Sequence, residues 1–319
     1  MVAISLMLEG QYGMTWYRWK KLVAEVEDLG FAGMFRSDHF TNANPPDMDS
    51  LEMIVSLTYL ADHTRRIHFG PLVAPFSFRN PMLLARQAAA LDDLSGGRMI
   101  LGVGAGWQER EHQLFGFELG DIATRMARFA EGLEVVTRLL KSDEAVTYEG
   151  RFYQLRGATL LPRPQRKGGP RILIGGNGPK RTLPLVARYA NIWNGTFLAP
   201  DEFRERSAIL DKLLSEAGRK PGDVRRTAMR GLYFGRDMKE LDRRLRWRAE
   251  NPDYAGKSLQ EVIDSMATRD HEIVGTADMV IEQIKTYEAA GAEELMLQWF
   301  DVDDLDGLRT FAKSVLPNV

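Results

Sequence analysis

Strand-like and helix-like patterns alternate along almost the whole chain, and this alternation limits the possible folds more than any other feature. Strand patterns are expected at 2–8, 34–35, 67–74, 99–103, 171–174, 192–193, 227–234 and 295–298. Helical patterns lie between them, the clearest at 121–141, where apolar residues from Ile122 to Leu140 recur at helical spacing. Such alternation predicts parallel strands joined by crossover helices.

Eight strand–helix units within 319 residues favour a closed (β/α)8 TIM barrel, an α/β fold, as a single domain spanning 1–319. An open, doubly wound sheet is the alternative. Two segments break the rhythm and are expected as insertions at the rim. The stretch 145–157 has Glu149-Gly150 between two aromatic-rich runs, which predicts a hairpin, and the charged stretch 237–272 predicts a helical excursion.

Composition excludes several classes of function. Charged residues make up 27% of the chain with a net charge of −2, so a nucleic-acid surface is not expected. Cysteine is absent, which excludes disulfides, thiol catalysis and cysteine–metal sites and fits a cytoplasmic protein. The sequence begins with a strand pattern instead of a signal peptide, and no apolar run approaches the length of a membrane span.

The tetrapeptide Ser37-Asp38-His39-Phe40 follows the second predicted strand. Barrel enzymes keep their catalytic groups at the carboxyl ends of strands, and histidine titrates near neutral pH. Asp38 and His39 are therefore the predicted catalytic residues. The alternative is that His39 is a buried structural histidine whose hydrogen bonds are satisfied.

Two glycine-rich loops follow later strands. In the first, Gly104 and Gly106 could let a flat ligand approach the backbone, or could simply form a tight turn; the spacing G-x-G-x-G is not the dinucleotide fingerprint. The second loop contains Gly175, Gly176, Asn177, Gly178, Lys180 and Arg181. Its position before a helix predicts phosphate binding, with a plain glycine turn as the alternative.

No metal site is predicted. None of the five histidines forms an H-E-x-x-H pattern, and Glu109 with His112 resembles only half of a di-iron site. A G-x-S-x-G motif is also absent, so a serine hydrolase is not supported.

Several of these motifs together resemble the bacterial luciferase-like superfamily of flavin- and deazaflavin-dependent oxidoreductases, in particular its branch that uses coenzyme F420. The matching segments are Glu27–Phe31, Ser37–Phe40, Ala89–Arg98 with Leu101–Trp107, Gly175–Pro179 and Val186–Asn191. The similarity covers 1 to about 235 and resumes at Ile273.

This resemblance implies a cofactor in the C-terminal mouth of the barrel. It implies a non-proline cis peptide at about Leu72-Val73 that backs the cofactor ring, with Ser37, Asp38 and His39 beside the ring. It also implies a homodimer and hydride transfer between F420 and a small organic substrate such as an enone or alcohol. An FMNH2-dependent two-component monooxygenase with FMN as cofactor, or a flavin-binding protein without turnover, are the alternatives.

The chain departs from the sugar-phosphate dehydrogenases of this branch at Trp107, where those enzymes have an acidic residue. Glu109 and Glu111 come later and are not expected to reach the substrate, so a sugar phosphate and a glutamate partner for His39 are both disfavoured. The expected substrate-lining residues are Glu9, Gln11, Trp107, Arg230 and Gln298.

Overall fold

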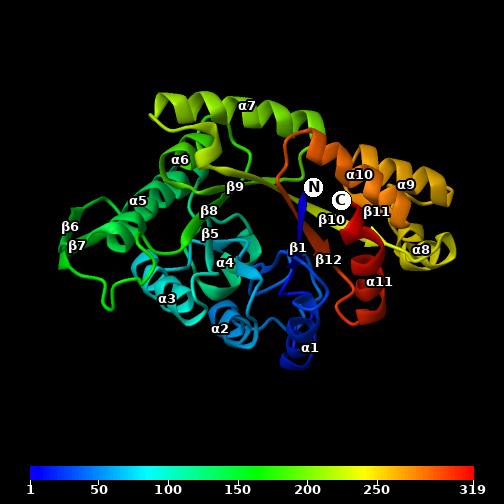
Figure 1. Ribbon diagram of the computed structural model, residues 1–319, viewed down its shortest axis with the longest axis horizontal. Helices are drawn as coiled ribbons and strands as arrows, with labels where there is room; N and C mark the ends of the chain where they lie inside the picture. The colour runs from blue at the N-terminus through cyan, green and yellow to red at the C-terminus, as the bar shows by residue number, and fades with distance from the viewer.

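A computed structural model describes residues 1–319 as a closed ring of parallel strands surrounded by helices (Figure 1). The strands of the ring are β1 (Ala3–Leu8), β2 (Gly33–Arg36), β3 (His68–Pro71), β4 (Ala74–Pro75), β5 (Ile100–Gly104), β8 (Arg171–Gly175), β9 (Ile192–Thr196), β10 (Arg225–Phe234) and β12 (Glu294–Trp299). Their order is β3-β2-β1-β12-β10-β9-β8-β5-β4.

The two ends of this order, β3 and β4, are halves of one interrupted strand. β3 pairs with β2, while β4 pairs with β5. A bridge between Phe69 and Met99, with the Phe69 amide donating to the Arg98 carbonyl at 3.3 Å, joins β3 to β5 and closes the ring. The predicted (β/α)8 barrel is confirmed, and the open sheet is excluded.

Eight helices cover the outside of the barrel. They are α1 (Trp16–Val26), α2 (Met53–His63), α3 (Pro81–Leu94), α5 (Ile122–Lys141), α6 (Thr182–Tyr189), α7 (Pro200–Glu216), α10 (Ala277–Ala289) and α11 (Leu305–Val315). Local sequence explains where several begin: Asn80 caps α3 ahead of Pro81, and Asp121 caps α5 by accepting from the Thr124 amide. No helix combines the length and apolarity needed to cross a membrane.

The apolar core has two main layers. One, of 68 buried residues, lies largely between strands and helices. The other fills the barrel axis and contains Met7, Phe35, Leu72, Ile100, Leu173, Ile192, Met229 and Met296. Because successive strand residues point to opposite faces, each strand except β3 and β4 contributes to both layers, and Leu72 joins the axial layer from the interruption between those two. Met7, Leu72 and Met229 of the axial layer also line the cavity at the mouth of the barrel.

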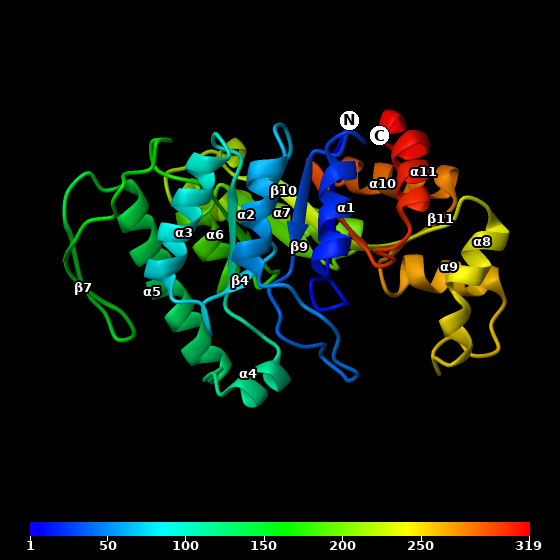
Figure 2. The ribbon, with the colours of Figure 1, turned by 90° about the horizontal axis from the view of Figure 1, so that it is seen from below.

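Both expected insertions are present. β6 (Val146–Glu149) and β7 (Gln154–Ala158) form an antiparallel hairpin that projects from the barrel (Figure 2). The excursion is helical, with α8 (Met238–Arg244), a 3-10 turn η2 (Arg246–Ala249) and α9 (Leu259–Thr268).

One further strand was not predicted. β11 (Ile273–Gly275) pairs with Leu232–Phe234 of β10 and attaches the end of the excursion to the barrel. Three residues are too few to establish an alternating pattern, so the sequence carried no signal for it.

Candidate functional site

The carboxyl ends of the strands open into a cavity of about 590 Å³. Figure 2 shows α4 (Glu109–Phe115) and the excursion on this side of the barrel, opposite the two termini. Twelve of the predicted site residues line the cavity: Glu9, Gln11, Ser37, His39, Leu72, Val73, Gly104, Gly106, Trp107, Gly175, Gly176 and Gln298. The barrel therefore gathers predicted residues from six separate segments of sequence at one mouth.

One wall of the cavity is the interruption between β3 and β4. The peptide bond between Leu72 and Val73 is cis, as the resemblance implied. Val73 presses against β5, since a Cβ on Gly104 would lie 2.7 Å from Val73 Cγ2. A Cβ on Gly102 would lie 2.0 Å from the Pro71 carbonyl oxygen. The glycines of this loop therefore allow strand and bulge to pack closely, a reason that differs from the expected approach of a ligand.

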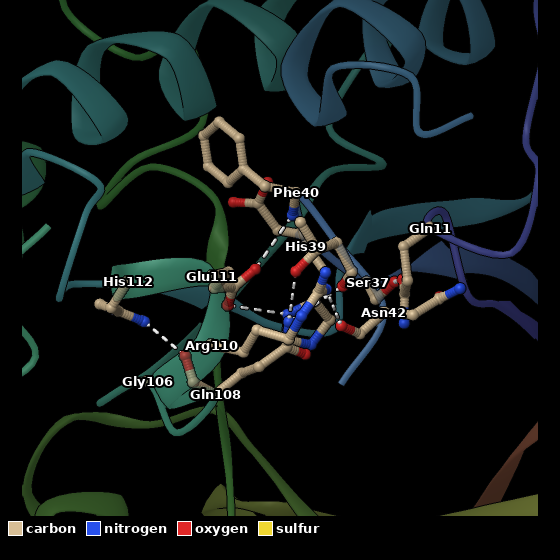
Figure 3. Close-up of polar contacts among 12 residues, drawn as sticks. Gln11, Ser37, His39, Phe40, Asn42, Gly106, Gln108, Arg110, Glu111 and His112 are labelled. Atoms are coloured by element: carbon tan, nitrogen blue, oxygen red, sulfur yellow. Dashed lines mark hydrogen bonds and ion pairs between the residues drawn. The ribbon is translucent and has the colours of Figure 1, made fainter. Parts of the chain in front are cut away.

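His39 is paired with a glutamate that sequence reasoning had set aside. His39 Nδ1 lies 3.0 Å from Glu111 Oε1, and the Phe40 amide donates to Glu111 Oε2 at 3.0 Å (Figure 3). The side chain of Glu111 is 1% exposed. The expectation that Glu111 lies too far along the chain is wrong, because the loop turns at Gly106 and α4 begins at Glu109, which brings its first turn back over the end of β2.

Glu111 sets the electrostatics of this pair. Burial of His39 by itself lowers the pKa of the imidazole. The hydrogen bond that the imidazole makes to Glu111 and the negative charges of Glu111, Glu9 and Asp38 outweigh this effect, so the pKa is raised above its ordinary value. Trp107 packs edge-on against the His39 ring, with centroids 5.6 Å apart. His39 is thus a largely buried, oriented imidazole on the cavity wall, with a pKa above its ordinary value.

A chain of polar contacts crosses the opposite part of the mouth. The Gln298 and Gln11 amides donate to the two carboxylate oxygens of Glu9, at 2.5 and 2.9 Å. Ser37 donates to Gln11 Oε1 at 2.7 Å and accepts from the Gly10 amide at 2.9 Å. Gln298 is 5% exposed and its Oε1 has no partner. A buried acceptor without a partner on a cavity wall suits a ligand that brings a hydrogen-bond donor.

Six predicted site residues do not line the cavity, two of them outside the loop after β8. Asp38 does not line the cavity; both of its carboxylate oxygens accept from Arg79, at 2.7 and 2.8 Å. Arg230 is fully buried on the outer face of β10 and donates to Tyr287 Oη at 2.6 Å. Its neighbour Met229 lines the cavity instead, because adjacent strand residues face opposite sides. The prediction that Arg230 lines the substrate cavity is therefore wrong. Asp38 is held by Arg79 beside the cavity, and its catalytic role stays a prediction.

The loop after β8 reaches the cavity only at its start. Beyond Gly176, the Asn177 side chain donates to the Thr196 carbonyl at 2.7 Å and accepts from the Thr196 amide at 2.9 Å. This pair of bonds ties the loop to the end of β9. Gly178 lies beyond that tie, and Lys180 and Arg181 are exposed just before α6. Phosphate binding by this loop stays a prediction.

Comparison with known proteins agrees with the fold. A protein from Amycolatopsis mediterranei named F420-dependent glucose-6-phosphate dehydrogenase is 28% identical over 92% of each chain. A phthiodiolone/phenolphthiodiolone dimycocerosates ketoreductase from Mycobacterium kansasii is 29% identical over 86% of this chain and 82% of its own. A 4-hydroxyprotoasukamycin monooxygenase from Streptomyces nodosus subsp. asukaensis is 32% identical, over 49% of this chain and 41% of its own.

Solved structures share the whole architecture. An F420-dependent secondary alcohol dehydrogenase, in complex with an F420–acetone adduct, superposes with a TM-score of 0.80 over 98% of both chains at 19% identity. The tetrahydromethanopterin reductase of Methanopyrus kandleri gives 0.79 over 99% of both at 20% identity. The family model for luciferase-like monooxygenases matches residues 5–294. With the barrel, the Leu72-Val73 cis peptide and the mouth residues in place, the chain belongs to the luciferase-like monooxygenase family.

Proposed function

We propose that this protein is an oxidoreductase that transfers a hydride between coenzyme F420 and a small organic substrate held in the mouth of the barrel. The observation that carries this proposal is the His39–Glu111 pair on the wall of the mouth cavity, with the two rings of His39 and Trp107 in contact. Relatives that align over most of their length with this chain and are named F420-dependent dehydrogenases support the choice of cofactor.

We expect the cavity to take a planar ring system. Gly104, Gly106, Gly175 and Gly176 line one side of it, so that side presents backbone in place of side chains, next to Val73. We expect the Leu72-Val73 segment to back the ring, and Gly175 with the loop toward Lys180 to hold the phosphate-bearing tail. When bound, F420 supplies or takes up a hydride.

His39 would exchange the proton that accompanies this transfer. Nδ1 faces Glu111, which leaves Nε2 as the ring nitrogen available to a substrate oxygen. With its pKa raised, His39 keeps a proton to donate when a carbonyl is reduced, and it accepts the proton when an alcohol is oxidised. The unpaired Gln298 Oε1 would accept from a hydroxyl group and so orient the substrate.

The cofactor assignment is tested by titrating the purified protein with F420 and with FMN and following the change in absorbance of each. We expect saturable F420 binding and much weaker FMN binding. Tight FMN binding with none for F420 would contradict the proposal.

A monooxygenase that uses reduced FMN is the second candidate, favoured by the partial match to 4-hydroxyprotoasukamycin monooxygenase. Oxygen consumption separates the two functions. An F420-dependent hydride transfer converts enones or alcohols without oxygen, whereas the monooxygenase consumes oxygen in step with product.

A further inference from the structure

We propose that a second cavity, beside the mouth, binds an aromatic group at the far end of the substrate, while the reacting group lies next to His39. This inference rests on the proposed function and specifies its substrate class. The second cavity measures about 320 Å³. Its walls are Leu232, Tyr233, Phe234, Arg244, Trp247, Trp299, Phe300 and Asp301.

The two cavities are built on the same two strands. Met229 of β10 and Gln298 of β12 line the main cavity. Leu232, three residues further along β10, and Trp299, which directly follows Gln298, line the second. One aromatic ring from each lining lies at the boundary between the two cavities. Tyr12 lines the main cavity, with its ring centroid 6.4 Å from that of Phe300, which lines the second. For one substrate to occupy both cavities, the link between its reacting group and its distal group must pass this pair of rings.

The walls select an aromatic group. Phe234 and Trp299 are buried and form the base, while Trp247 is 38% exposed and forms the outer lip. The rings of Tyr233 and Phe300 lie 5.1 Å apart, and those of Tyr233 and Trp247 6.1 Å apart, both tilted. Aromatic pairs at such spacing contribute attraction beyond the burial of area, so a planar ring gains more here than an alkyl group.

The charged residues of the second cavity do not favour an anion. Arg244 is paired with Glu240 at 3.0 Å, with Asp301 at 3.4 Å and with Asp304, so its charge is more than balanced. A phosphate or carboxylate would meet Asp301 at the rim. The occupant is therefore an uncharged aromatic or polycyclic group, and the substrate class is a carbonyl compound or alcohol that carries one.

The helical excursion places the residues that decide this preference. Arg244 ends α8 and Trp247 lies in η2, whereas the reacting groups lie on the barrel itself. The insertion thus adds Arg244 and Trp247 to a cavity whose other walls come from the ends of β10 and β12.

The test compares a methyl ketone that carries a naphthyl group with butanone, which lacks it. The Kd of the naphthyl ketone is measured by calorimetry on the protein, which requires no turnover. Trp247→Ala should raise that Kd about tenfold, and Trp247→Phe should restore it to within about twofold. The matched control is Trp16→Ala on α1, which is 39% exposed and has an aromatic neighbour, Tyr59, at 6.1 Å; it should leave the Kd unchanged.

An unchanged Kd in Trp247→Ala, or an equal rise in Trp16→Ala, would overturn the inference. If the alanine variant fails to fold, Trp247→Leu against Trp247→Phe decides the question, since equal Kd values would show that no aromatic contact is made. Turnover of butanone with F420 is then measured separately. If butanone is turned over but the Kd of the naphthyl ketone does not depend on Trp247, only the role of the second cavity is contradicted. If that Kd depends on Trp247 but butanone is not turned over, only the proposed function is contradicted.

Discussion

At the scale of single residues, the chemistry of His39 depends on one neighbour. Glu111 accepts from the Phe40 amide and bonds His39 Nδ1, so it orients the imidazole and stabilises its charged form. A histidine without this partner would be neutral more often when buried. The position of Glu111 on α4 therefore influences the pKa of His39, which follows the end of β2.

The first prediction concerns the pH dependence of this pair. Because Glu111 raises the pKa of His39, Glu111→Gln should lower it, and carbonyl reduction, which needs the protonated imidazole, should then fail at a lower pH than in the parent protein. The alkaline limb of kcat/KM against pH measures this shift. Glu109→Gln, an exposed neighbour on the same helix, serves as the control. If the alkaline limbs of the kcat/KM profiles of the parent protein and of Glu111→Gln coincide, His39 is not the proton donor.

The same shift makes a stability contribution with a defined sign. The folded pKa of His39 lies above the unfolded value, so the pair stabilises the fold fully below the unfolded pKa, and this stabilisation is lost as pH rises through the folded pKa. Thermal unfolding of the parent and of Glu111→Gln should therefore differ more at acidic than at alkaline pH.

At the scale of secondary-structure elements, the interruption between β3 and β4 and the strand β5 are built as one unit. Glycines along β5 leave room for Pro71 and Val73, as their missing Cβ atoms would collide with both residues. The motif that resembles a ligand-binding turn is thus also a packing motif for the wall of the mouth.

A substitution at Gly104 tests this packing. Gly104→Ala places a Cβ 2.7 Å from Val73 Cγ2, so we expect a loss of about 1–3 kcal/mol in the free energy of unfolding and weaker cofactor binding. Denaturant unfolding measures the first effect and the F420 titration the second. Gly222→Ala is the matched control, since a Cβ there meets no atom within 4 Å. Equal stability of both variants would mean that the wall tolerates a shift of Val73.

The loop before α6 carries a prediction of its own. Lys180 and Arg181 are exposed just before that helix, where a phosphate would gain from both positive charges. Replacing both by Ala should weaken F420 binding several-fold and reduce its sensitivity to salt, with turnover at saturation preserved. Lys20 and Lys21 on α1 provide a control pair of the same charge. Salt-independent binding in the parent would place the tail elsewhere.

At the scale of the whole molecule, barrel closure brings together residues that are remote in the chain. Glu9 and Gln298 are 289 positions apart and share a hydrogen bond at the mouth. Outside the barrel, α1, α2 and α3 expose Tyr17, Val55 and Leu83 by 67, 54 and 55%. Neighbouring helices that expose large apolar side chains are typical of surfaces that bind another protein.

We accordingly expect a homodimer that uses this face. Light scattering after gel filtration should report twice the 36.1 kDa of one chain. Val55→Lys with Leu83→Lys should shift the mass toward one chain, whereas Leu161→Lys, at an exposed position on another part of the surface, should not. A single-chain mass for the parent at micromolar concentration would refute the dimer.

The sequence by itself determined the barrel and the elements of its rim, together with the segments that supply the mouth. Strand and helix periods, caps such as Asn80 and the turn at Glu149-Gly150 act over a few residues, so they can be recognised locally. Only the tertiary structure decided the partners of each functional side chain. Glu111 reaches His39 across 72 positions, Asp38 meets Arg79, and Arg230 faces outward where Met229 faces the cavity. Those outcomes depend on the angle at which a loop leaves a strand and on which face of the strand a residue occupies, which closure of the barrel sets and short-range patterns do not record.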